Sequence, residues 1–279
     1  MIVFPNCKIN LGLSILGKRA DGFHDLETCF YPLPLTDVLE IIPARSDDPF
    51  NAPSPLFSAS GLTVAGDPQQ NLSVKAYHLL KEGFPLLPPI KMHLHKLIPM
   101  GAGLGGGSAD GAFTLRLLND LFDLQLTANQ LIQYASRLGS DCPFFVVNKP
   151  CLAKGRGEIL EETNLNLEEY GFLVVCPDIH VNTGWAFSQL SPQLPLNHPM
   201  PVQEAIRQPL ETWKEILVND FEKPVFQQFP EIREIKDRLY EQGALYASMS
   251  GSGSSLFGIF NRGQKPDPAA WEGYTTYFM

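Results

Sequence analysis

The sequence predicts an α+β protein, built either as two lobes or as one elaborated domain. Its 279 residues are long enough for a substantial core in either arrangement, and its composition, 44% hydrophobic and 18% charged, is that of a globular protein. Three features support this class. They are a β-rich opening, a glycine-rich segment between a strand and a helix, and a Gly/Ser loop between two strands near the end.

The N-terminal region has the pattern of β-structure. Polar and apolar residues alternate over residues 7–15, which is the period of a strand with one face buried. Lys8 and Asn10 would then point to the same side. Residues 26–33 and 38–42 follow a turn signal and predict further antiparallel strands.

The next segment changes from loop to helix and back to strand. Residues 43–71 are rich in Pro, Ser, Asp and Gly and predict mostly surface loop, with one short strand at 62–65. A helix is expected to start near Asn71, because apolar residues recur at helical spacing until shortly before Pro85. Residues 90–98 alternate as in a strand and lead directly into the glycines.

The second half of the chain combines helical patterns with short apolar runs. A helix is expected to begin at Ala109, where the glycines stop, and a second helix at 128–138 to be closed by Gly139. The remaining predicted elements are strands at 144–147 and 172–176, a helix at 231–242, and a strand, Gly/Ser loop and strand across 244–260. The tail, residues 264–279, has no assignment.

The glycine-rich segment, residues 99–110, is the main functional signal. It holds five glycines in seven positions between a predicted strand and a predicted helix. Glycines let the backbone approach a polyphosphate closely, and the free N–H groups and macrodipole at a helix start attract anions. Ser108 is able to cap the helix or to offer its hydroxyl to a phosphate or metal ion, and Asp110 favours the positive helix end. We therefore expect a nucleotide-phosphate site, with a plain flexible loop as the alternative.

The same glycines contain G-x-G-x-x-G at Gly101, Gly103 and Gly106, so a nicotinamide-dependent oxidoreductase is a second alternative. That fold needs a second parallel strand ending in an acidic residue about 20 residues later. Asp123 falls between two helical patterns, which disfavours it. A Walker loop would need Gly-Lys-Ser/Thr at its end, and the protein-kinase motifs H-R-D, D-F-G and V-A-I-K are missing.

Phosphoryl transfer to an alcohol needs a group that accepts the hydroxyl proton. Asp141 is the candidate, because it stands between a helix end and an apolar run; an Asx-turn or a helix cap is the alternative role. Lys8, on an otherwise apolar strand, either reaches solvent or pairs with a carboxylate. Paired with Asp141, Lys8 would orient that carboxylate and keep it ionised.

Two further segments have a functional and a plain interpretation. Phe23 and His24 follow a turn, where together they could hold a flat polar ring by stacking and hydrogen bonding. The alternative is a turn histidine that is merely exposed. The Gly/Ser loop 248–255 is either a hairpin turn without a role or a second wall of the phosphate site.

Composition excludes several classes of partner. The formal net charge of −9 and the lack of a Lys/Arg run argue against nucleic acid. Five scattered cysteines without C-x-x-C predict reduced, buried thiols rather than disulfides or a zinc site. No apolar stretch of about 18 residues occurs, and residues 1–16 lack a secretory pattern, so we expect a cytoplasmic protein without a membrane partner.

Together these motifs resemble the GHMP kinase superfamily, whose phosphate loop and C-terminal Gly/Ser hairpin match residues 99–109 and 249–255. Within it, the chain is similar to the family of 4-diphosphocytidyl-2-C-methyl-D-erythritol kinases of the non-mevalonate isoprenoid pathway. The matching motifs are Lys8-Ile-Asn-Leu-Gly-Leu, Gly22-Phe-His-Asp-Leu, Asn71-Leu-Ser-Val-Lys-Ala, Leu104-Gly-Gly-Gly-Ser-Ala-Asp and Gly139-Ser-Asp-Cys-Pro-Phe-Phe. They occur in order over roughly residues 3–260.

The resemblance implies an N-terminal lobe like the second domain of ribosomal protein S5, a C-terminal α+β lobe, and an active site in the cleft. The polar stretch 158–169 would separate the lobes, as residues 1–162 and 163–279. It also implies ATP-dependent phosphorylation of the 2-hydroxyl of a cytidine-diphosphate-linked polyol, with Asp141 as base and Lys8 polarising the hydroxyl.

The remaining site residues are carried over in the same way. Those implied for substrate are Asn10, Phe23, His24, Thr183 and Phe187. Those implied for ATP are Lys96, Pro99, Met100, Gly101, Ala102, Gly103, Leu104, Gly105, Gly106, Gly107, Ser108 and Ala109. The family usually has Tyr before the histidine, so Phe23 keeps a stacking face but loses a hydroxyl.

No acidic residue is assigned to a metal, so Mg²⁺ is expected to be carried by ATP, Ser108 and water. A monomer or weak homodimer is expected. The nearest alternative is another GHMP kinase that phosphorylates homoserine, mevalonate or a sugar.

Overall fold

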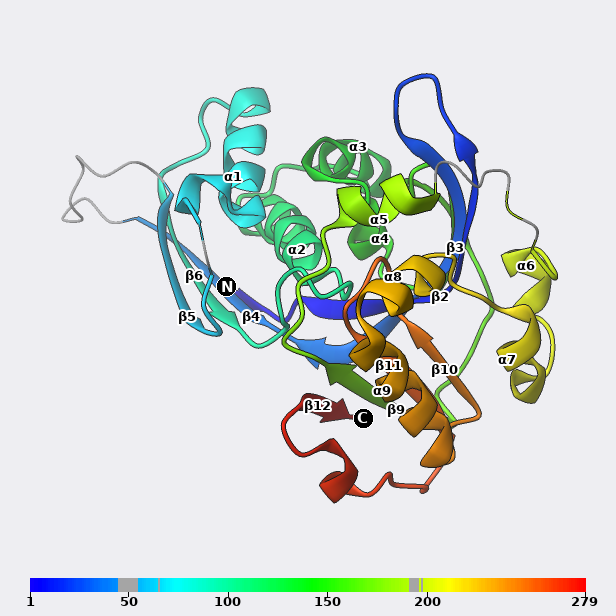
Figure 1. Cartoon of the computed structure of the whole chain (residues 1–279). Helices are drawn as coiled ribbons and strands as arrows, with labels where there is room; N and C mark the ends of the chain where they lie inside the picture. The colour runs from blue at the N-terminus through cyan, green and yellow to red at the C-terminus, as the bar shows by residue number, and fades with distance from the viewer. Residues whose placement is uncertain (45–54, 65, 191–195, 197) are drawn as a thin grey trace. The chain divides into compact units, whose positions relative to one another are not determined.

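The computed structural model of the chain describes residues 1–44, 55–64, 66–190, 196 and 198–279 (Figure 1). Packing divides the chain into two compact units, each assembled from separate segments. The first unit comprises Met1–Cys7, Pro34–Met100 and Gly105–Asn148, and the second comprises Lys8–Leu33, Gly101–Leu104 and Lys149–Met279. Helices and strands occur in both units, which confirms the α+β class.

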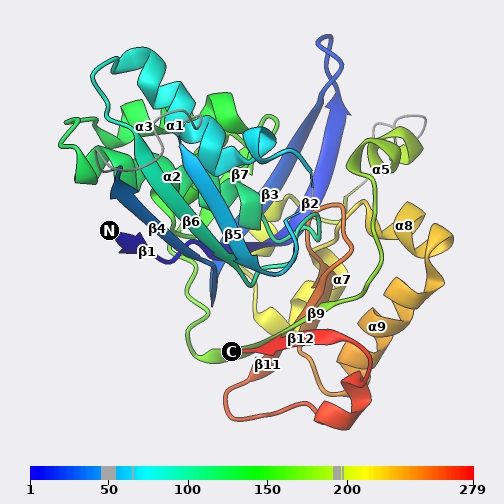
Figure 2. The same ribbon diagram turned by 90° about the vertical axis from the view of Figure 1, so that its left-hand side faces the viewer.

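The first unit is a four-stranded sheet with helices on one face (Figure 2). Its strand order is β1 (Ile2–Val3), β4 (Val38–Pro43), β6 (Ile90–Lys96) and β5 (Leu56–Gly61), antiparallel apart from the parallel β5–β6 pair. Its helices are α1 (Leu72–Gly83), α2 (Gly106–Leu121), α3 (Ala128–Leu138) and α4 (Cys142–Val147), with the 3-10 turn η1 (Pro68–Gln70) before α1. Strand β6 buries every second residue, so the side chain of Lys96 lies on the buried side with those of Met92 and Leu94.

The second unit contains two further four-stranded sheets. One has the order β2 (Asn6–Lys18), β3 (His24–Thr36), β7 (Cys151–Lys154) and β8 (Ile159–Glu162), and its first strand begins in the first unit. The other has the order β10 (Tyr246–Met249), β11 (Leu256–Asn261), β9 (Tyr170–Cys176) and β12 (Thr275–Phe278). The helical elements are α5 (Thr183–Leu190), α6 (Val202–Ala205), η3 (Leu210–Thr212), α7 (Trp213–Ile216), α8 (Glu222–Gln228), α9 (Pro230–Glu241) and η4 (Pro268–Trp271).

The core of the second unit joins its C-terminal sheet to helices α5, α8 and α9. Buried residues from these elements, among them Val175, Ala186, Val225, Ile235 and Phe260, form one hydrophobic cluster. Apolar burial of this kind is the dominant stabilising contribution, at about 25 cal/mol per Å² removed from water. The cluster fixes the base of the Gly/Ser loop between β10 and β11, which is part of the candidate site.

The predicted boundaries of helices α1 and α3 are confirmed, and their capping residues act as expected. Asn71 caps α1 by accepting a hydrogen bond from the Ser73 amide at 2.9 Å. Thr127 and Gln130 form a capping box at the start of α3, and Gly139 follows its end. All five cysteines are free and buried, as predicted.

The strand predicted at 62–65 is misplaced. Strand β5 comprises Leu56–Gly61 and pairs in parallel with β6, whereas Leu62–Val64 lies outside any strand and residue 65 is outside the described residues. Residues 58–61 are Ser, Ala, Ser and Gly, which have little intrinsic strand preference, so pairing with β6 determines the strand.

The strand predicted at 144–147 is wrong, because this apolar run belongs to helix α4. A short apolar run does not distinguish a buried strand from a buried helix. The deciding signals flank it. Pro143 stands in the first turn, and Asn148 closes the helix in the left-handed conformation at φ 53°.

Strand β2 is confirmed, but the expectation that only one of its faces is buried is wrong. Residues 6–15 are all buried, including Lys8, Asn10 and Ser14, which are 3%, 2% and 3% exposed. Polar groups are tolerated in such a place only when they are hydrogen-bonded. Their partners define the candidate site.

Candidate active site

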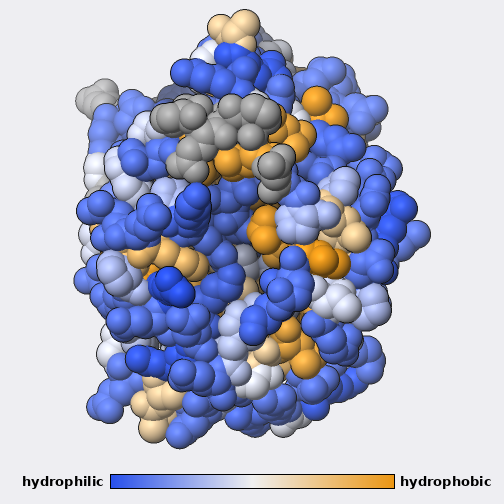
Figure 3. Space-filling model, turned by 45° about the vertical axis from the view of Figure 1, so that its right-hand side comes forward, coloured by the Kyte–Doolittle hydropathy of each residue, from blue (hydrophilic) through white to orange (hydrophobic). Residues whose placement is uncertain are grey.

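The surface and the overall charge set the background for an anion site. Figure 3 shows a face on which hydrophilic residues predominate and hydrophobic ones lie in separate patches. With a formal net charge of −9, the protein as a whole repels polyphosphates. Oriented main-chain amides are a local source of positive potential that does not depend on the net charge.

The glycine segment provides such amides at the start of α2. The helix begins at Gly106, not at Ala109 as predicted, and Gly105 precedes it in the left-handed conformation at φ 72°. The amide of Ala109 donates to the carbonyl of Gly105 at 2.9 Å, so the amides of Gly106, Gly107 and Ser108 come before the first intrahelical hydrogen bond. Ser108 lies inside the first turn and does not cap the helix.

The dinucleotide-binding alternative is wrong. The chain passes from α2 into α3 without an intervening strand, so no parallel strand follows the glycines as that fold requires. Asp123 lies between the two helices at φ 50° and is not at the end of a strand.

The middle of the loop, Gly101–Leu104, packs against the Gly/Ser hairpin of the second unit. The carbonyl of Gly103 accepts hydrogen bonds from Lys8 Nζ at 3.1 Å and from Ser250 Oγ at 2.8 Å. A Cβ atom at Gly103 would lie 2.0 Å from the Ser250 carbonyl oxygen, so only glycine fits. The amide of Ser255 donates to the Ala102 carbonyl at 3.1 Å. The loop 248–255 is therefore more than a hairpin turn, because it holds the glycine loop.

The other residues of the glycine loop contact the surrounding protein. The Leu104 carbonyl accepts from the Lys8 amide at 2.9 Å, and the Leu104 side chain is buried. Gly101 faces the His180 ring, Pro99 is half-buried, and Met100 is 47% exposed. These contacts therefore hold the loop in one conformation.

A buried polar network surrounds Lys8. Its ammonium donates to Asn10 Oδ1 at 2.7 Å and lies 5.1 Å from the ring centroid of Phe30. Asn10 Nδ2 donates to Thr28 Oγ1 at 3.1 Å, and the Asn10 amide donates to Ser250 Oγ at 3.3 Å. The structure thus brings together Lys8, Asn10 and the glycine loop. Sequence reasoning missed Thr28, which has no signal of its own in the strand pattern.

Asp141 stands immediately before helix α4, with φ −84° and ψ −16°. Its side chain makes no capping hydrogen bond, so the role of helix cap does not account for it. Asp141 belongs to the first unit and Lys8 to the second, and their pairing stays a prediction.

Lys96 lies inside the protein, between two carboxylates. It is 1% exposed, forms an ion pair with Asp37 Oδ2, and donates to Asp110 Oδ2 at 2.8 Å. Asp37 Oδ1 in turn accepts the amides of Leu97 at 2.6 Å and Ile98 at 2.8 Å. The ammonium of Lys96 pairs with these two carboxylates, and the expected binding of ATP by Lys96 stays a prediction. Sequence reasoning missed Asp37, whose partners lie about 60 residues away in the chain.

A cavity of about 380 Å³ in the first unit adjoins the glycine loop. The apolar side chains of Phe57, Leu72 and Leu94 line it together with Lys96 and with Gly107 of the loop. Its volume lies within the range of small-molecule sites, and a mostly apolar wall with a few polar groups suits a nucleobase.

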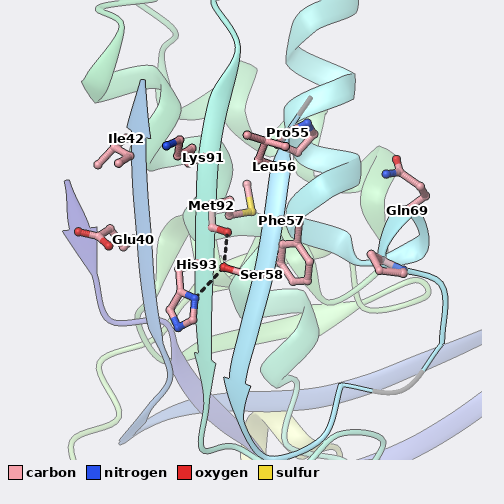
Figure 4. Close-up of a pocket in the computed structure, with 11 residues that line it drawn as sticks. Glu40, Ile42, Pro55, Leu56, Phe57, Ser58, Gln69, Lys91, Met92 and His93 are labelled. Atoms are coloured by element: carbon pink, nitrogen blue, oxygen red, sulfur yellow. Dashed lines mark hydrogen bonds between the residues drawn. The ribbon is translucent and has the colours of Figure 1, made fainter. Parts of the chain in front are cut away.

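A larger hollow of about 720 Å³ lies at strands β4, β5 and β6 (Figure 4). Glu40, Lys91 and His93 line it, and Ser58 Oγ is 2.8 Å from His93 Nδ1. None of the predicted site residues lines this hollow, so it is not the candidate nucleotide site.

An aromatic pair marks the candidate substrate side in the second unit. The rings of His24 and Phe187 stack with centroids 4.7 Å apart and an interplanar angle of 16°. Phe187 also meets the ring of Phe221 edge-on at 4.8 Å. Burial, with a smaller contribution from Lys18, lowers the pKa of His24, so a neutral imidazole is favoured near pH 7. His24 is 9% exposed, which argues against the merely exposed turn histidine.

Phe23 does not join this stack. Its ring is 51% exposed, and the Arg156 guanidinium lies 4.8 Å from its centroid. Helix α5 carries the other two predicted substrate residues, Thr183 and Phe187, one turn apart. The hydroxyl of Thr183 lies 2.9 Å from Ser252 Oγ, and the ring of Phe187 stacks on His24.

Two absences concern the described part of the chain only. No group of three or more His, Cys, Asp or Glu side chains there is arranged to hold a metal ion. Nor does any helix among these residues have both the length and the apolar character to cross a bilayer.

Family models match both halves of the chain. The model for the N-terminal domain of GHMP kinases matches residues 71–149, and that for the GHMP kinase C-terminal region matches residues 202–270. The first contains the glycine loop and Asp141, and the second contains the Gly/Ser hairpin.

Curated relatives extend the similarity over nearly the whole chain. The 4-diphosphocytidyl-2-C-methyl-D-erythritol kinase of Bacteroides fragilis is 52% identical over 266 residues, which is 95% of this chain and 94% of the relative. The kinase of the same name from Porphyromonas gingivalis is 44% identical over 271 residues, 97% of this chain and 96% of the relative.

Solved structures agree. A crystal structure of 4-(cytidine 5'-diphospho)-2C-methyl-D-erythritol kinase matches with a TM-score of 0.83 and 29% identity, covering 100% of this chain and 98% of that one. The Methanococcus jannaschii mevalonate kinase shares the fold at a TM-score of 0.71, with 12% identity and coverage of 100% and 97%. The chain therefore belongs to the GHMP kinase family and, within it, to the 4-diphosphocytidyl-2-C-methyl-D-erythritol kinases.

Proposed function

We propose that this phosphotransferase transfers the γ-phosphate of ATP to the 2-hydroxyl of 4-diphosphocytidyl-2-C-methyl-D-erythritol, giving the 2-phosphate and ADP. The step belongs to non-mevalonate isoprenoid precursor synthesis, in the cytoplasm. The observation that carries the choice of substrate is the 52% identity with the Bacteroides fragilis kinase across 95% of the chain.

Asp141 acts as the general base in a direct in-line transfer. Its carboxylate takes the proton of the 2-hydroxyl, the oxygen attacks the γ-phosphorus, and the bond to the β,γ-bridging oxygen breaks as ADP leaves. Lys8 polarises the same hydroxyl, and Asn10 holds the Lys8 ammonium at 2.7 Å. The proposal requires Asp141 and Lys8 to act on one oxygen.

The nucleotide occupies the cavity beside α2. The adenine ring lies between the apolar side chains that line the 380 Å³ cavity, and the phosphates lie on the main-chain amides of Gly106, Gly107 and Ser108. Mg²⁺ prefers oxygen ligands, and Ser108 offers one hydroxyl near the phosphates. The donor set thus fits a metal held mainly by the nucleotide, which neutralises charge on the transferred phosphoryl group.

The cytidine end of the substrate belongs to the second unit. The stacked pair of His24 and Phe187 offers an outer ring face to the cytosine, with Phe23 as a further stacking face, and Thr183 borders the substrate. A neutral His24 keeps one ring nitrogen as an acceptor and the other as a donor.

A coupled ADP-release assay tests the substrate. We expect turnover with the cytidine-linked polyol and none with homoserine, mevalonate or a sugar. Turnover with one of those alcohols, but not with the polyol, would move the chain to another branch of the family.

The substitution Asp141→Asn tests the base. We expect kcat to fall by about 10²–10⁴, the effect typical of a general base, with nearly unchanged ATP affinity. Asp123→Asn is the matched control, because Asp123 lies in the same unit in a left-handed turn that asparagine also accepts. Full activity in the Asp141 variant would remove that residue from its role.

A further inference from the structure

Asp37 accepts three hydrogen bonds at the end of β6, the strand that leads into the glycine loop. It lies between β3 and β4, is fully buried, and its own amide donates to the Pro5 carbonyl at 2.8 Å. Oδ1 accepts two consecutive main-chain amides, those of Leu97 and Ile98, and Oδ2 accepts the Lys96 ammonium. A short buried side chain that accepts three donors from one strand end fixes the direction in which that strand leaves the sheet.

Lys96 connects Asp37 to the other end of the loop, because its ammonium also contacts Asp110 in α2. Its ammonium donates at 2.8 Å to Asp110 Oδ2, on the second turn of α2. It also lies directly beneath the first helical residue, because a Cβ atom built on Gly106 would be 3.0 Å from Nζ. The entry of the loop and its exit into α2 are thus tied to one buried cation.

We propose that Asp37 is a positioning residue for ATP binding, holding the two ends of the glycine loop at the spacing that aims the α2 amides at the triphosphate. The inference rests on the proposed function, since it needs the phosphates on those amides. Glycines leave the loop itself compliant, so its geometry must be set from outside it. Hydrogen bonds to phosphate lose strength steeply with misalignment.

Charge and position must be separated in any test. At pH 8 and above, where Asp110 with its pKa of about 7 is ionised as well, one lysine between two carboxylates leaves an excess negative charge beneath an anion site. At that pH, removing either carboxylate would by itself favour a triphosphate, so binding is compared there. A variant that removes the negative charge of Asp37 therefore needs a control variant. The control must remove one negative charge from the same cluster and keep the hydrogen bonds that Asp37 makes to Lys96, Leu97 and Ile98.

Asparagine provides this pair of variants. In Asp37→Asn the side-chain amide has one oxygen, whereas Asp37 uses one oxygen for Lys96 and the other for the two main-chain amides. Either Lys96 or the two main-chain amides would then face an NH₂ group, which cannot accept their hydrogen bonds. At position 110 the conflict does not arise. Asp110 Oδ1 is buried without a hydrogen-bond partner among the described residues, so in Asp110→Asn the NH₂ group takes its place and the oxygen stays on Lys96.

The experiment measures binding of β,γ-methylene-ATP and of adenosine to the full chain in both variants. We expect Asp37→Asn to bind the triphosphate at least about tenfold more weakly than Asp110→Asn, the loss of roughly one well-aligned hydrogen bond, while adenosine affinity differs by less than about twofold. A purely structural role would weaken both ligands together. Equal triphosphate affinity in the two variants, or equal losses for both ligands, overturns the inference.

Lys96→Arg is the second variant, for use if Asp37→Asn does not fold. It keeps every charge but places a larger cation against Gly106, so a positional role predicts the same selective loss of triphosphate affinity. Unchanged triphosphate affinity in this variant would contradict the proposal. Failure of the wild-type chain to bind β,γ-methylene-ATP would instead overturn the proposed nucleotide site itself.

Discussion

Asp110 is a carboxyl group whose ionisation the fold opposes. Burial raises the pKa of its carboxyl from 3.8 to about 7, with Lys96 opposing the rise and Asp37 adding to it. Because the folded state holds this proton where the unfolded state has released it, the free energy of unfolding decreases as pH rises from about 4 to about 7.

The variant Asp110→Asn removes this titration. We expect urea unfolding to show a smaller loss of stability between pH 5 and pH 8 in the variant than in the wild type. Parallel stability curves for the two proteins over that range would show that Asp110 is ionised throughout.

Phe187 tests the substrate side at the same scale. Phe187→Leu keeps apolar contact with Phe221 but removes the flat face that stacks on His24. We expect the KM for the cytidine substrate to rise about 2- to 10-fold, with the KM for ATP unchanged. Trp185→Leu is the control, because Trp185 lies on the same helix but meets Phe229. Equal effects of the two substitutions would contradict the assignment.

The polar members of the network differ in how visible they were in the sequence. Lys8 and Asn10 stand out because they break an apolar strand at one side, and their contact at 2.7 Å confirms that they point the same way. Asp37 and Thr28 do not stand out, because an aspartate near a turn and a threonine in a strand are ordinary. Only their distant partners, such as the amide of Ile98, reveal their roles.

At the scale of elements, the glycine loop depends on its contact with the Gly/Ser hairpin. Gly103→Ala would introduce a Cβ atom 2.0 Å from the Ser250 carbonyl, at a backbone φ of 81°. We expect a loss of about 2 kcal/mol or more in stability and a weakened nucleotide site. Gly107→Ala, in the first turn of α2 with open space around it, should instead gain about 0.5–1 kcal/mol. Thermal unfolding of the two variants distinguishes these outcomes.

Helices that end at a proline or glycine signal were predictable from the sequence. Strands that exist only through pairing with a distant strand were not. Helices α1 and α3 end where Pro85 and Gly139 indicate, because caps act within a few residues. Strand β5 exists through its parallel pairing with β6, and the tail forms β12 by pairing with β9. Long-range pairing leaves little trace in a single strand's composition.

At the scale of the whole molecule, the two compact units are interleaved along the chain. Gly101–Leu104 belongs to the second unit although the residues on both sides of it belong to the first. The division at residue 162 stays a prediction, since the family models match 71–149 and 202–270 and neither reaches it. Oligomeric state likewise stays a prediction.

The sequence by itself determined the fold class and the family, and it predicted the segments of the candidate site, because glycine spacing, strand alternation and helix caps are local signals. The tertiary structure decided what those segments contact. It placed Lys96 between two carboxylates, made 144–147 a helix, and joined Gly103 to Ser250. The physical reason is that a buried polar group is stable only with a partner, and such partners come from parts of the chain that no local pattern connects.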